Sequence, residues 1–267
     1  MAVVTLITDF GTRDAYVGVM KGAILSVDPR AVIVDITHGV PPQDLACSAR
    51  ELADAFTYFP PETVHVTVVD PGVGSGRRIL AVAAAGQLFL APDNGILPAS
   101  LAGVGVDAAV SVENRSLFRQ PVSPTFHGRD IFAPVAGHLS LGLALGSLGP
   151  AVAWHDLVRL TISGPRPTPG GGLTGTIIAV DRFGNLITDI CRSDLERLAG
   201  RKSWQRLTVR LGTEEIHGIA GIYADGVSQK PIALLGSRGR LEVAVRDGSA
   251  VVRFSARRGD PVYISTR

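Results

Sequence analysis

Apolar and β-branched residues recur in short runs through the first half of the chain, and each run stops near a turn-forming residue. The runs cover residues 3–7, 31–36, 63–69, 79–83 and 108–112. Runs that are apolar at nearly every position are typical of parallel strands buried on both faces. Residues 14–27, 43–58 and 130–141 instead repeat apolar side chains at helical spacing. Alternating strands and helices predict an α/β domain with a mostly parallel sheet.

The pattern changes at residues 163–172, Ser-Gly-Pro-Arg-Pro-Thr-Pro-Gly-Gly-Gly, which we interpret as an irregular linker. Short apolar runs separated by Gly, Asp and Asn follow it, at 173–180, 207–211, 232–235, 241–245, 251–254 and 262–264. This half is predicted to be a smaller all-β domain, a barrel or a sandwich, and two of its turns are typical of hairpins. The predicted domains are therefore 1–162 and 173–267.

Composition narrows the class of protein. Hydrophobic residues make up 46% of the 267 and charged residues 19%, which is enough apolar surface for a folded core. The net charge is only +2, and Lys and Arg are scattered, so nucleic acid is not an expected partner. No apolar run approaches the ~18 residues of a membrane span, and the amino terminus lacks the basic region of a signal peptide. Two cysteines, Cys47 and Cys191, without metal-site spacing favour reduced thiols and a cytoplasmic location.

The first polar cluster, residues 8–14, directly follows the first predicted strand and opens the first predicted helix. Asp9 is then held at the carboxyl end of a strand, where ligands of α/β folds bind, and its carboxylate suits ligand hydroxyls. We expect Asp14 to be the helix N-cap.

Two further clusters lie at equivalent places. Asp70-Pro-Gly-Val-Gly-Ser-Gly-Arg77-Arg78 follows the third strand, and its glycines allow the backbone to approach a ligand closely. It lacks the Gly-Lys-Ser/Thr ending of a phosphate-binding P-loop, and a structural turn explains it equally well. His127 lies beside Gly128 at the start of a predicted helix, an accessible place for a catalytic group. No close-spaced ligand pattern supports a metal, so none is expected.

In the second half, Phe183 and Asn185 lie in one predicted hairpin turn and offer a ring and an amide to a planar base. Together with the Asp9 turn, the motifs Asp70-Pro-Gly-Val-Gly, Pro92-Asp-Asn-Gly95, Phe126-His-Gly-Arg-Asp130, Asp181-Arg-Phe-Gly-Asn185 and Ser237-Arg-Gly-Arg-Leu-Glu242 occur in a fixed order. In this order the chain resembles the S-adenosyl-L-methionine (SAM) hydroxide adenosyltransferases, which are SAM hydrolases related to fluorinase and chlorinase.

The resemblance implies a reaction, an assembly and a set of residues. The reaction is hydrolysis of SAM to adenosine and L-methionine without a cofactor, in a homotrimer whose active sites lie at subunit interfaces. The implied catalytic residues are Asp70, Arg77 and His127, with Arg78 as an alternative to Arg77. The implied substrate-binding residues are Asp9 at the ribose, Asp70, Phe183 and Asn185 around the adenosine, Ser237 and Glu242 around the methionine, and Tyr223 and Val245 at the adenine.

The chemistry agrees with such a triad. The group that leaves C5′ is a neutral thioether and needs no general acid, whereas water must lose a proton to attack. Arg77 favours hydroxide, and either His127 or Asp70 accepts the proton; the sequence leaves both open. Halogenating relatives lack the triad and carry a hydroxyl-bearing residue in place of Asp70, so hydrolysis is favoured over halogenation and over a non-catalytic SAM or adenosine sensor.

Overall fold

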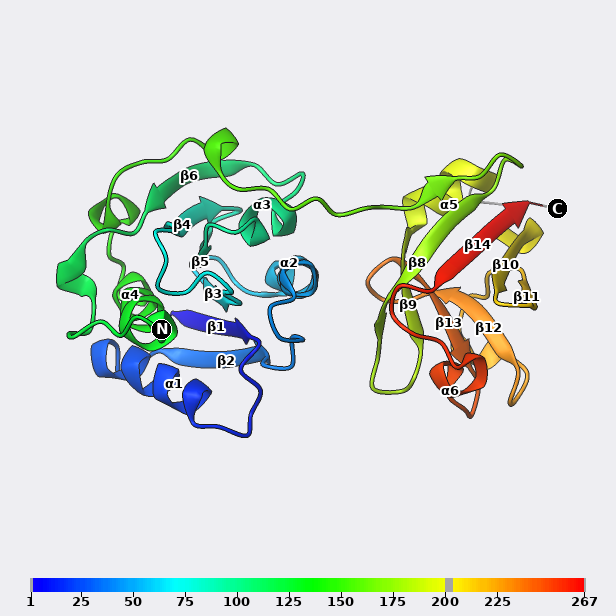
Figure 1. The fold of residues 1–267 in the computed structure, drawn as a ribbon, viewed down its shortest axis with the longest axis horizontal. Coiled ribbons are helices and arrows are strands. Elements are labelled where there is room, and N and C mark those ends of the chain that lie inside the picture. Colours follow the sequence, from blue (N-terminus) through cyan, green and yellow to red (C-terminus); the bar gives the residue numbers. More distant parts are fainter. Residues whose placement is uncertain (1, 200–203, 267) are drawn as a thin grey trace. The chain divides into compact units, whose positions relative to one another are not determined.

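The computed structural model describes residues 2–199 and 204–266. The chain forms two compact units, Met1–Ile162 and Ser163–Arg267. The first contains an α/β sheet and the second an antiparallel sheet, as the hydrophobic pattern predicts (Figure 1). In the part of the chain that the structure describes, no helix is long and apolar enough to cross a membrane.

Six strands form the sheet of the first unit, in the order β2-β1-β3-β5-β4-β6. They are β1 (Val3–Thr8), β2 (Val32–Thr37), β3 (Val64–Val68), β4 (Ile79–Ala84), β5 (Gln87–Pro92) and β6 (Val106–Ser111). β1 pairs in parallel with β2 and β3, and β3 with β5. β4 runs antiparallel to both β5 and β6. The sheet is therefore mostly parallel, and the carboxyl ends of β1, β2 and β3 lie at one edge.

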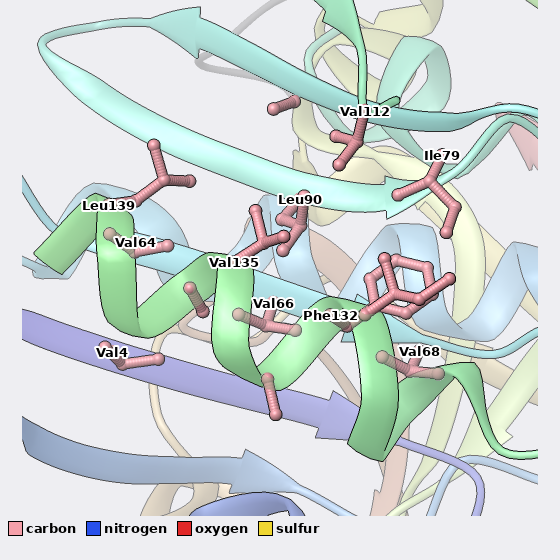
Figure 2. Packing of buried hydrophobic residues seen from close by; sticks show 14 of the residues in the cluster. Val4, Val64, Val66, Val68, Ile79, Leu90, Val112, Phe132, Val135 and Leu139 are labelled. Carbon is pink, nitrogen blue, oxygen red and sulfur yellow. The ribbon is translucent and has the colours of Figure 1, made fainter. Parts of the chain in front are cut away.

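Helices cover both faces of this sheet. They are α1 (Tyr16–Val27), α2 (Leu45–Ala55), α3 (Ile96–Ser100) and α4 (Ala133–Ser140), with short turns η1 (Phe56–Tyr58), η2 (Arg115–Leu117), η3 (Gly128–Phe132), η4 (Leu145–Leu148) and η5 (Trp154–Asp156). Val4 and Leu6 on β1 pack with α1 and α4, whereas Ile7 on the same strand packs with α2 and α3. Alternate side chains of a strand point to opposite faces, so each strand contributes to two cores. Figure 2 shows α4 lying over β3 in the first of these cores.

Antiparallel pairing joins all the strands of the second unit, in the order β11-β10-β14-β8-β9-β13-β12, with β7 beside β8. They are β7 (Arg166–Pro167), β8 (Leu173–Val180), β9 (Leu186–Cys191), β10 (Leu207–Leu211), β11 (Glu214–His217), β12 (Pro231–Leu235), β13 (Arg240–Val245) and β14 (Pro261–Thr266). The remaining elements are α5 (Arg192–Ala199), η6 (Trp204–Arg206), η7 (Tyr223–Asp225) and α6 (Ala250–Phe254). A bridge between Ala220 and Leu234 links the two ends of the sheet, which nearly closes into a barrel around its own core.

Three local expectations are wrong. Residues 251–254, expected as a strand, belong to α6, because Ala250 and Phe254 are one helical turn apart and both pack on the core while Val252 faces solvent. The Pro/Gly segment is not wholly irregular, since Arg166 and Pro167 pair with β8 at an edge where proline is tolerated. Asp14 does not cap α1: the helix begins at Tyr16, so Ala15 occupies the N-cap position.

Candidate active site

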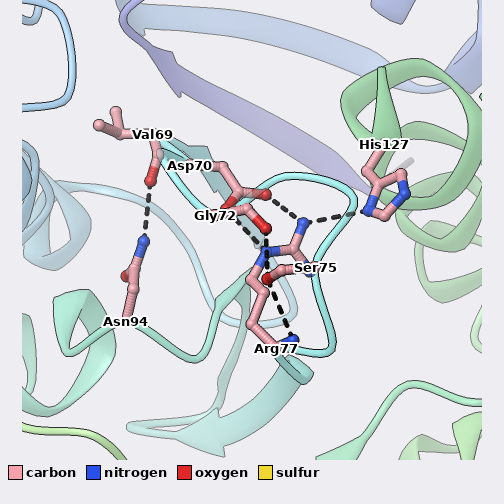
Figure 3. Close-up of polar contacts among 7 residues, drawn as sticks. All are labelled: Val69, Asp70, Gly72, Ser75, Arg77, Asn94 and His127. Atoms are coloured by element: carbon pink, nitrogen blue, oxygen red, sulfur yellow. Dashed lines mark hydrogen bonds and ion pairs between the residues drawn. The ribbon is translucent and has the colours of Figure 1, made fainter. Parts of the chain in front are cut away.

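Asp70 and Arg77 lie at the two ends of one turn. Asp70 comes two residues after β3 and Arg77 two residues before β4. Arg77 Nε donates a hydrogen bond of 2.7 Å to Asp70 Oδ1, and Arg77 Nη2 donates to Asp70 Oδ2 (Figure 3). Both side chains are largely buried, so this two-point pair is shielded from water and orients the guanidinium rigidly.

Glycine is required inside this turn. Gly74 has a φ of +79°, and a Cβ atom there would lie 2.3 Å from the carbonyl oxygen of Pro124. Pro124 belongs to the segment that leads to His127, so the Asp70 turn and this segment pack backbone against backbone. Any other residue at 74 forces the two segments apart.

His127 completes the group from the N-cap position of η3. Its Nδ1 lies 3.1 Å from Arg77 Nη2, and because arginine has only donors, Nδ1 accepts this hydrogen bond. A neutral imidazole in this contact carries its proton on Nε2. Burial lowers the pKa of His127 and the charge of Arg77 lowers it further, while Asp70 and Asp130 act in the opposite direction without cancelling the shift. His127 is therefore neutral at pH 7.

Arg78 takes a different direction from Arg77. Its Nε donates to Asp93 Oδ2 at 2.8 Å, and its Nη2 donates to the Asp156 carbonyl at 3.0 Å. Neighbouring residues of an extended segment point to opposite sides, which explains why Arg77 meets Asp70 and Arg78 does not. Asn94, beside Asp93, donates to the carbonyl of Val69 at 2.9 Å and so fixes the backbone just before Asp70.

Asp9 follows β1, and its Oδ2 accepts a hydrogen bond of 2.8 Å from the backbone N–H of Gln43. The ring of Phe10, the next residue, packs edge-on against Tyr16 and Phe126, with ring centroids 6.0 Å apart in both pairs. Phe126 precedes His127. The Asp9 turn is therefore connected through aromatic contacts to the segment that carries His127.

A hollow of about 430 Å³ opens beside Arg77 and His127. Its other polar walls come from Arg78, Ser111, Glu113 and Arg115. Arg77 and His127 both line this hollow, whose polar walls suit a bound water molecule.

The second unit has a hollow of its own, about 720 Å³ in volume. Six residues expected from the resemblance line it: Phe183, Asn185, Tyr223, Ser237, Glu242 and Val245. They come from the β8–β9 turn, from η7 and from the β12–β13 hairpin, three segments far apart in the sequence. The structure thus gathers them in one place.

The polar side chains of this hollow are held in pairs. Tyr223 donates its hydroxyl hydrogen to Glu242 Oε2 at 2.8 Å, and burial together with the Glu242 carboxylate raises the pKa of Tyr223 to about 12. Asn185 donates from Nδ2 to Asp181 Oδ2 at 2.8 Å, which leaves the amide oxygen available as an acceptor. The ring of Phe183 is 77% exposed and has a face open to a ligand.

Two carboxylates that position the site received no role from the sequence. Asp130 is fully buried, accepts from Arg129 Nε at 2.6 Å and from the backbone N–H of Ser123 at 2.8 Å, and holds the loop that leads into His127. Asp181 holds Asn185. Both belong to motifs named in the sequence analysis, Phe126–Asp130 and Asp181–Asn185. The sequence feature that could have identified them is an acidic residue beside an arginine or before a Gly-Asn turn.

Comparisons with known proteins identify the family of the chain. The family model described as the SAM hydroxide adenosyltransferase N-terminal domain matches residues 4–149, and the model of the C-terminal domain of the same family matches residues 175–263. The chain belongs to the SAM hydroxide adenosyltransferase family.

Similar proteins extend over nearly the whole chain. An (R)-S-adenosyl-L-methionine hydrolase of Salinispora tropica is 38% identical, with 98% of this chain and 97% of the relative covered. One from Thermus thermophilus is 37% identical over 99% of this chain and all of the relative. A fluorinase from an Actinoplanes species is 29% identical over 98% of this chain and 97% of the relative. A crystal structure of an uncharacterized Thermotoga maritima protein superposes with a TM-score of 0.88 at 36% identity, over 98% of this chain and 99% of that one.

Proposed function

We propose that this protein hydrolyses SAM to adenosine and L-methionine, through attack of water on the C5′ carbon of the ribose. Family membership and the named activity of relatives at 37–38% identity support the reaction. The observation that carries the proposal is that Arg77 contacts both Asp70 and His127, with Arg77 and His127 lining a polar hollow.

The leaving group decides what these residues have to do. Methionine departs from the sulfonium as a neutral thioether, so no acid is needed at the sulfur. Water is a weak nucleophile, and a positioned proton acceptor accelerates its attack by about 10²–10⁴-fold. One proton is released for each SAM cleaved, which makes the fate of that proton the main task of the site.

We assign proton acceptance to Asp70. The lone pair of neutral His127 at Nδ1 is occupied by Arg77, so His127 presents an Nε2–H donor on its other edge and orients the oxygen of the water. Each carboxylate oxygen of Asp70 keeps a second lone pair after bonding Arg77. Arg77 fixes both partners and stabilises the negative charge that develops on the water oxygen.

Substrate recognition is divided between the two units. Asp9 follows a parallel strand and suits the ribose hydroxyls, while Phe183, Asn185, Tyr223 and Val245 suit the adenosine. Ser237 and Glu242, in the same hollow, suit the methionine and its ammonium group. We further propose a homotrimer in the cytoplasm, in which each substrate is bound by residues of two subunits, and we expect the reaction to need no cofactor.

Product analysis with labelled water tests the proposal. Purified protein incubated with SAM in ¹⁸O-water is expected to yield L-methionine and adenosine labelled at the 5′ oxygen. Asp70→Asn is expected to reduce turnover by about 10²–10⁴-fold. The matched control, Asp107→Asn, makes the same change on an exposed residue at the other end of the sheet and is expected to retain activity.

Three other results would contradict the proposal, and the product formed distinguishes them. A 5′-halo-5′-deoxyadenosine formed in the presence of halide would mean halogenation instead of hydrolysis. Unchanged SAM would mean a binding protein. Label-free adenosine would mean that water does not attack C5′.

A further inference from the structure

A second group of polar side chains lies at the same edge of the sheet, beside Asp9 and away from the Asp70 triad. Thr8 is the last residue of β1, and His38 follows β2, the parallel neighbour of β1. Both side chains are buried. Thr8 Oγ1 lies 2.8 Å from His38 Nδ1, and Asp35 Oδ1, on β2, lies 3.0 Å from His38 Nε2.

The available donors and acceptors decide which group donates in each contact between Thr8, His38 and Asp35. The backbone N–H of Phe10 donates to Thr8 Oγ1 at 3.3 Å, and the Asp35 carboxylate beside His38 Nε2 favours a hydrogen on that nitrogen, so the Thr8 hydroxyl donates to His38 Nδ1. His38 then carries its hydrogen on Nε2, on the side of the Asp35 carboxylate. That N–H is not aligned with the carboxylate oxygen, so the contact acts through charge and favours this tautomer.

Asp35 is itself held in place. Lys21 Nζ on α1 lies 2.5 Å from Asp35 Oδ2. Burial raises the pKa of Asp35, but its contacts with Lys21 and His38 outweigh burial and keep the pKa below its ordinary value. The carboxylate is therefore charged at neutral pH, and it forms the end of the Thr8–His38–Asp35 series that lies farthest from Asp9.

The other end of the series contacts the turn that carries Asp9. Thr8 holds the N–H of Phe10, and the carbonyl of His38 accepts from the N–H of Gly11 at 2.8 Å. Asp9 directly precedes these two tethered N–H groups, and among the contacts described its carboxylate is bonded only to the N–H of Gln43. The orientation of its carboxylate thus depends on residues that do not touch a ligand.

We propose that Thr8, His38 and Asp35 form a relay that positions the Asp9 carboxylate for the ribose hydroxyls of the substrate. The inference rests on the proposed function, because it takes Asp9 as the ribose contact. Thr8, His38 and Asp35 are positioning residues: they act through Asp9 and through the Phe10–Gly11 backbone.

Two ligands that differ only in the ribose hydroxyls distinguish a role in positioning Asp9 from a general role in supporting the fold. Adenosine carries both ribose hydroxyls and 2′,3′-dideoxyadenosine carries neither, so the ratio of their dissociation constants reports the hydroxyl contacts alone. Calorimetric titration of the full-length protein gives both constants. Thr8→Val removes the hydroxyl at nearly constant shape, and Thr8→Ser restores it.

Loss of one hydrogen bond corresponds to about 0.5–1.5 kcal/mol, or about a 2- to 12-fold change in binding. Thr8→Val is expected to lower the adenosine preference within that range while leaving the affinity for dideoxyadenosine unchanged. Thr8→Ser is expected to keep the full preference. Asp35→Asn, on a partly exposed side chain, is expected to lower the preference less than Thr8→Val does.

Asp9→Asn serves as the reference variant. If Asp9→Asn removes the preference and Thr8→Val does not, the relay is wrong and the ribose contact stands. If Thr8→Val weakens both ligands equally, its role is structural and the relay is wrong as well. If Asp9→Asn leaves the preference intact, the ribose contact itself is wrong, and the role of the relay in binding fails with it.

Discussion

The hollow of the second unit and the triad of the first differ in how their polar groups are bonded. Asp70 and His127 are both bonded to Arg77, so a change in the charge of one of the three is felt by the other two. In the hollow, Tyr223 and Asn185 are held by Glu242 and Asp181, and the ring of Phe183 is open. Coupled ionisable groups suit proton chemistry, whereas side chains fixed at one end suit recognition.

Apart from Asp70→Asn, the largest expected effect comes from displacing the triad without altering any of its members. Gly74→Ala puts a Cβ atom against the Pro124 carbonyl and moves the Asp70 turn away from the His127 segment. Misplacement by about 1 Å is enough to reduce kcat by about 10²-fold. Gly76→Ala is the matched control, because a Cβ at Gly76 has open space around it.

Steady-state kinetics of the two variants, with circular dichroism to check folding, measure this difference. Equal kcat values for Gly74→Ala and Gly76→Ala would contradict the idea that the chemistry depends on the spacing of the two segments. Since the hollow of the second unit is untouched, its contribution to binding is expected to survive both substitutions.

A smaller effect is expected from the hollow. Phe183→Leu removes the open ring that we propose contacts the adenosine, and an aromatic contact of about 0.5–1.5 kcal/mol corresponds to about a 2- to 12-fold increase in KM. kcat is expected to stay unchanged, because the proposed role of the ring is recognition and not proton transfer. Tyr58→Leu, which replaces an even more exposed ring of the first unit, is the control. A fall in kcat with unchanged KM would assign Phe183 to the chemistry instead.

The sequence predicts the fold best where one local rule decides. The runs at β1, β2 and β3 are apolar at nearly every position and were found, although β2, an edge strand, has no fully buried residue. β5 was missed, because the turn before it is Ala85-Gly86, both with positive φ, and alanine there gives none of the usual Asn-Gly signal. α6 was mistaken for a strand because four residues are too few for their period to be read.

The site shows the same limit. Motifs at strand and helix ends identified Asp70, Arg77 and His127 as candidates, but their mutual bonds depend on backbone packing at Gly74, which spacing alone does not contain. The choice between Arg77 and Arg78 depends on which side of the chain each faces, and that is set by where β4 begins. Asp130 and Asp93 stayed without a role because burial, rather than residue type, makes them positioning groups.

The smallest expected effect is a pH shift within the triad. Burial and Arg77 lower the pKa of His127, so the neutral form that accepts from Arg77 persists below the ordinary value of 6.5, and kcat is expected to fall only on the acid side of that value. Asp70 opposes this shift, so Asp70→Asn is expected to lower the pKa of His127 further, and NMR titration of the imidazole measures it. In the hollow, Tyr223 does not change charge near neutral pH, because its pKa is about 12. A rise in the pKa of His127 in Asp70→Asn would show that the two groups are not coupled through charge, and the contrast between the two regions would lose its basis.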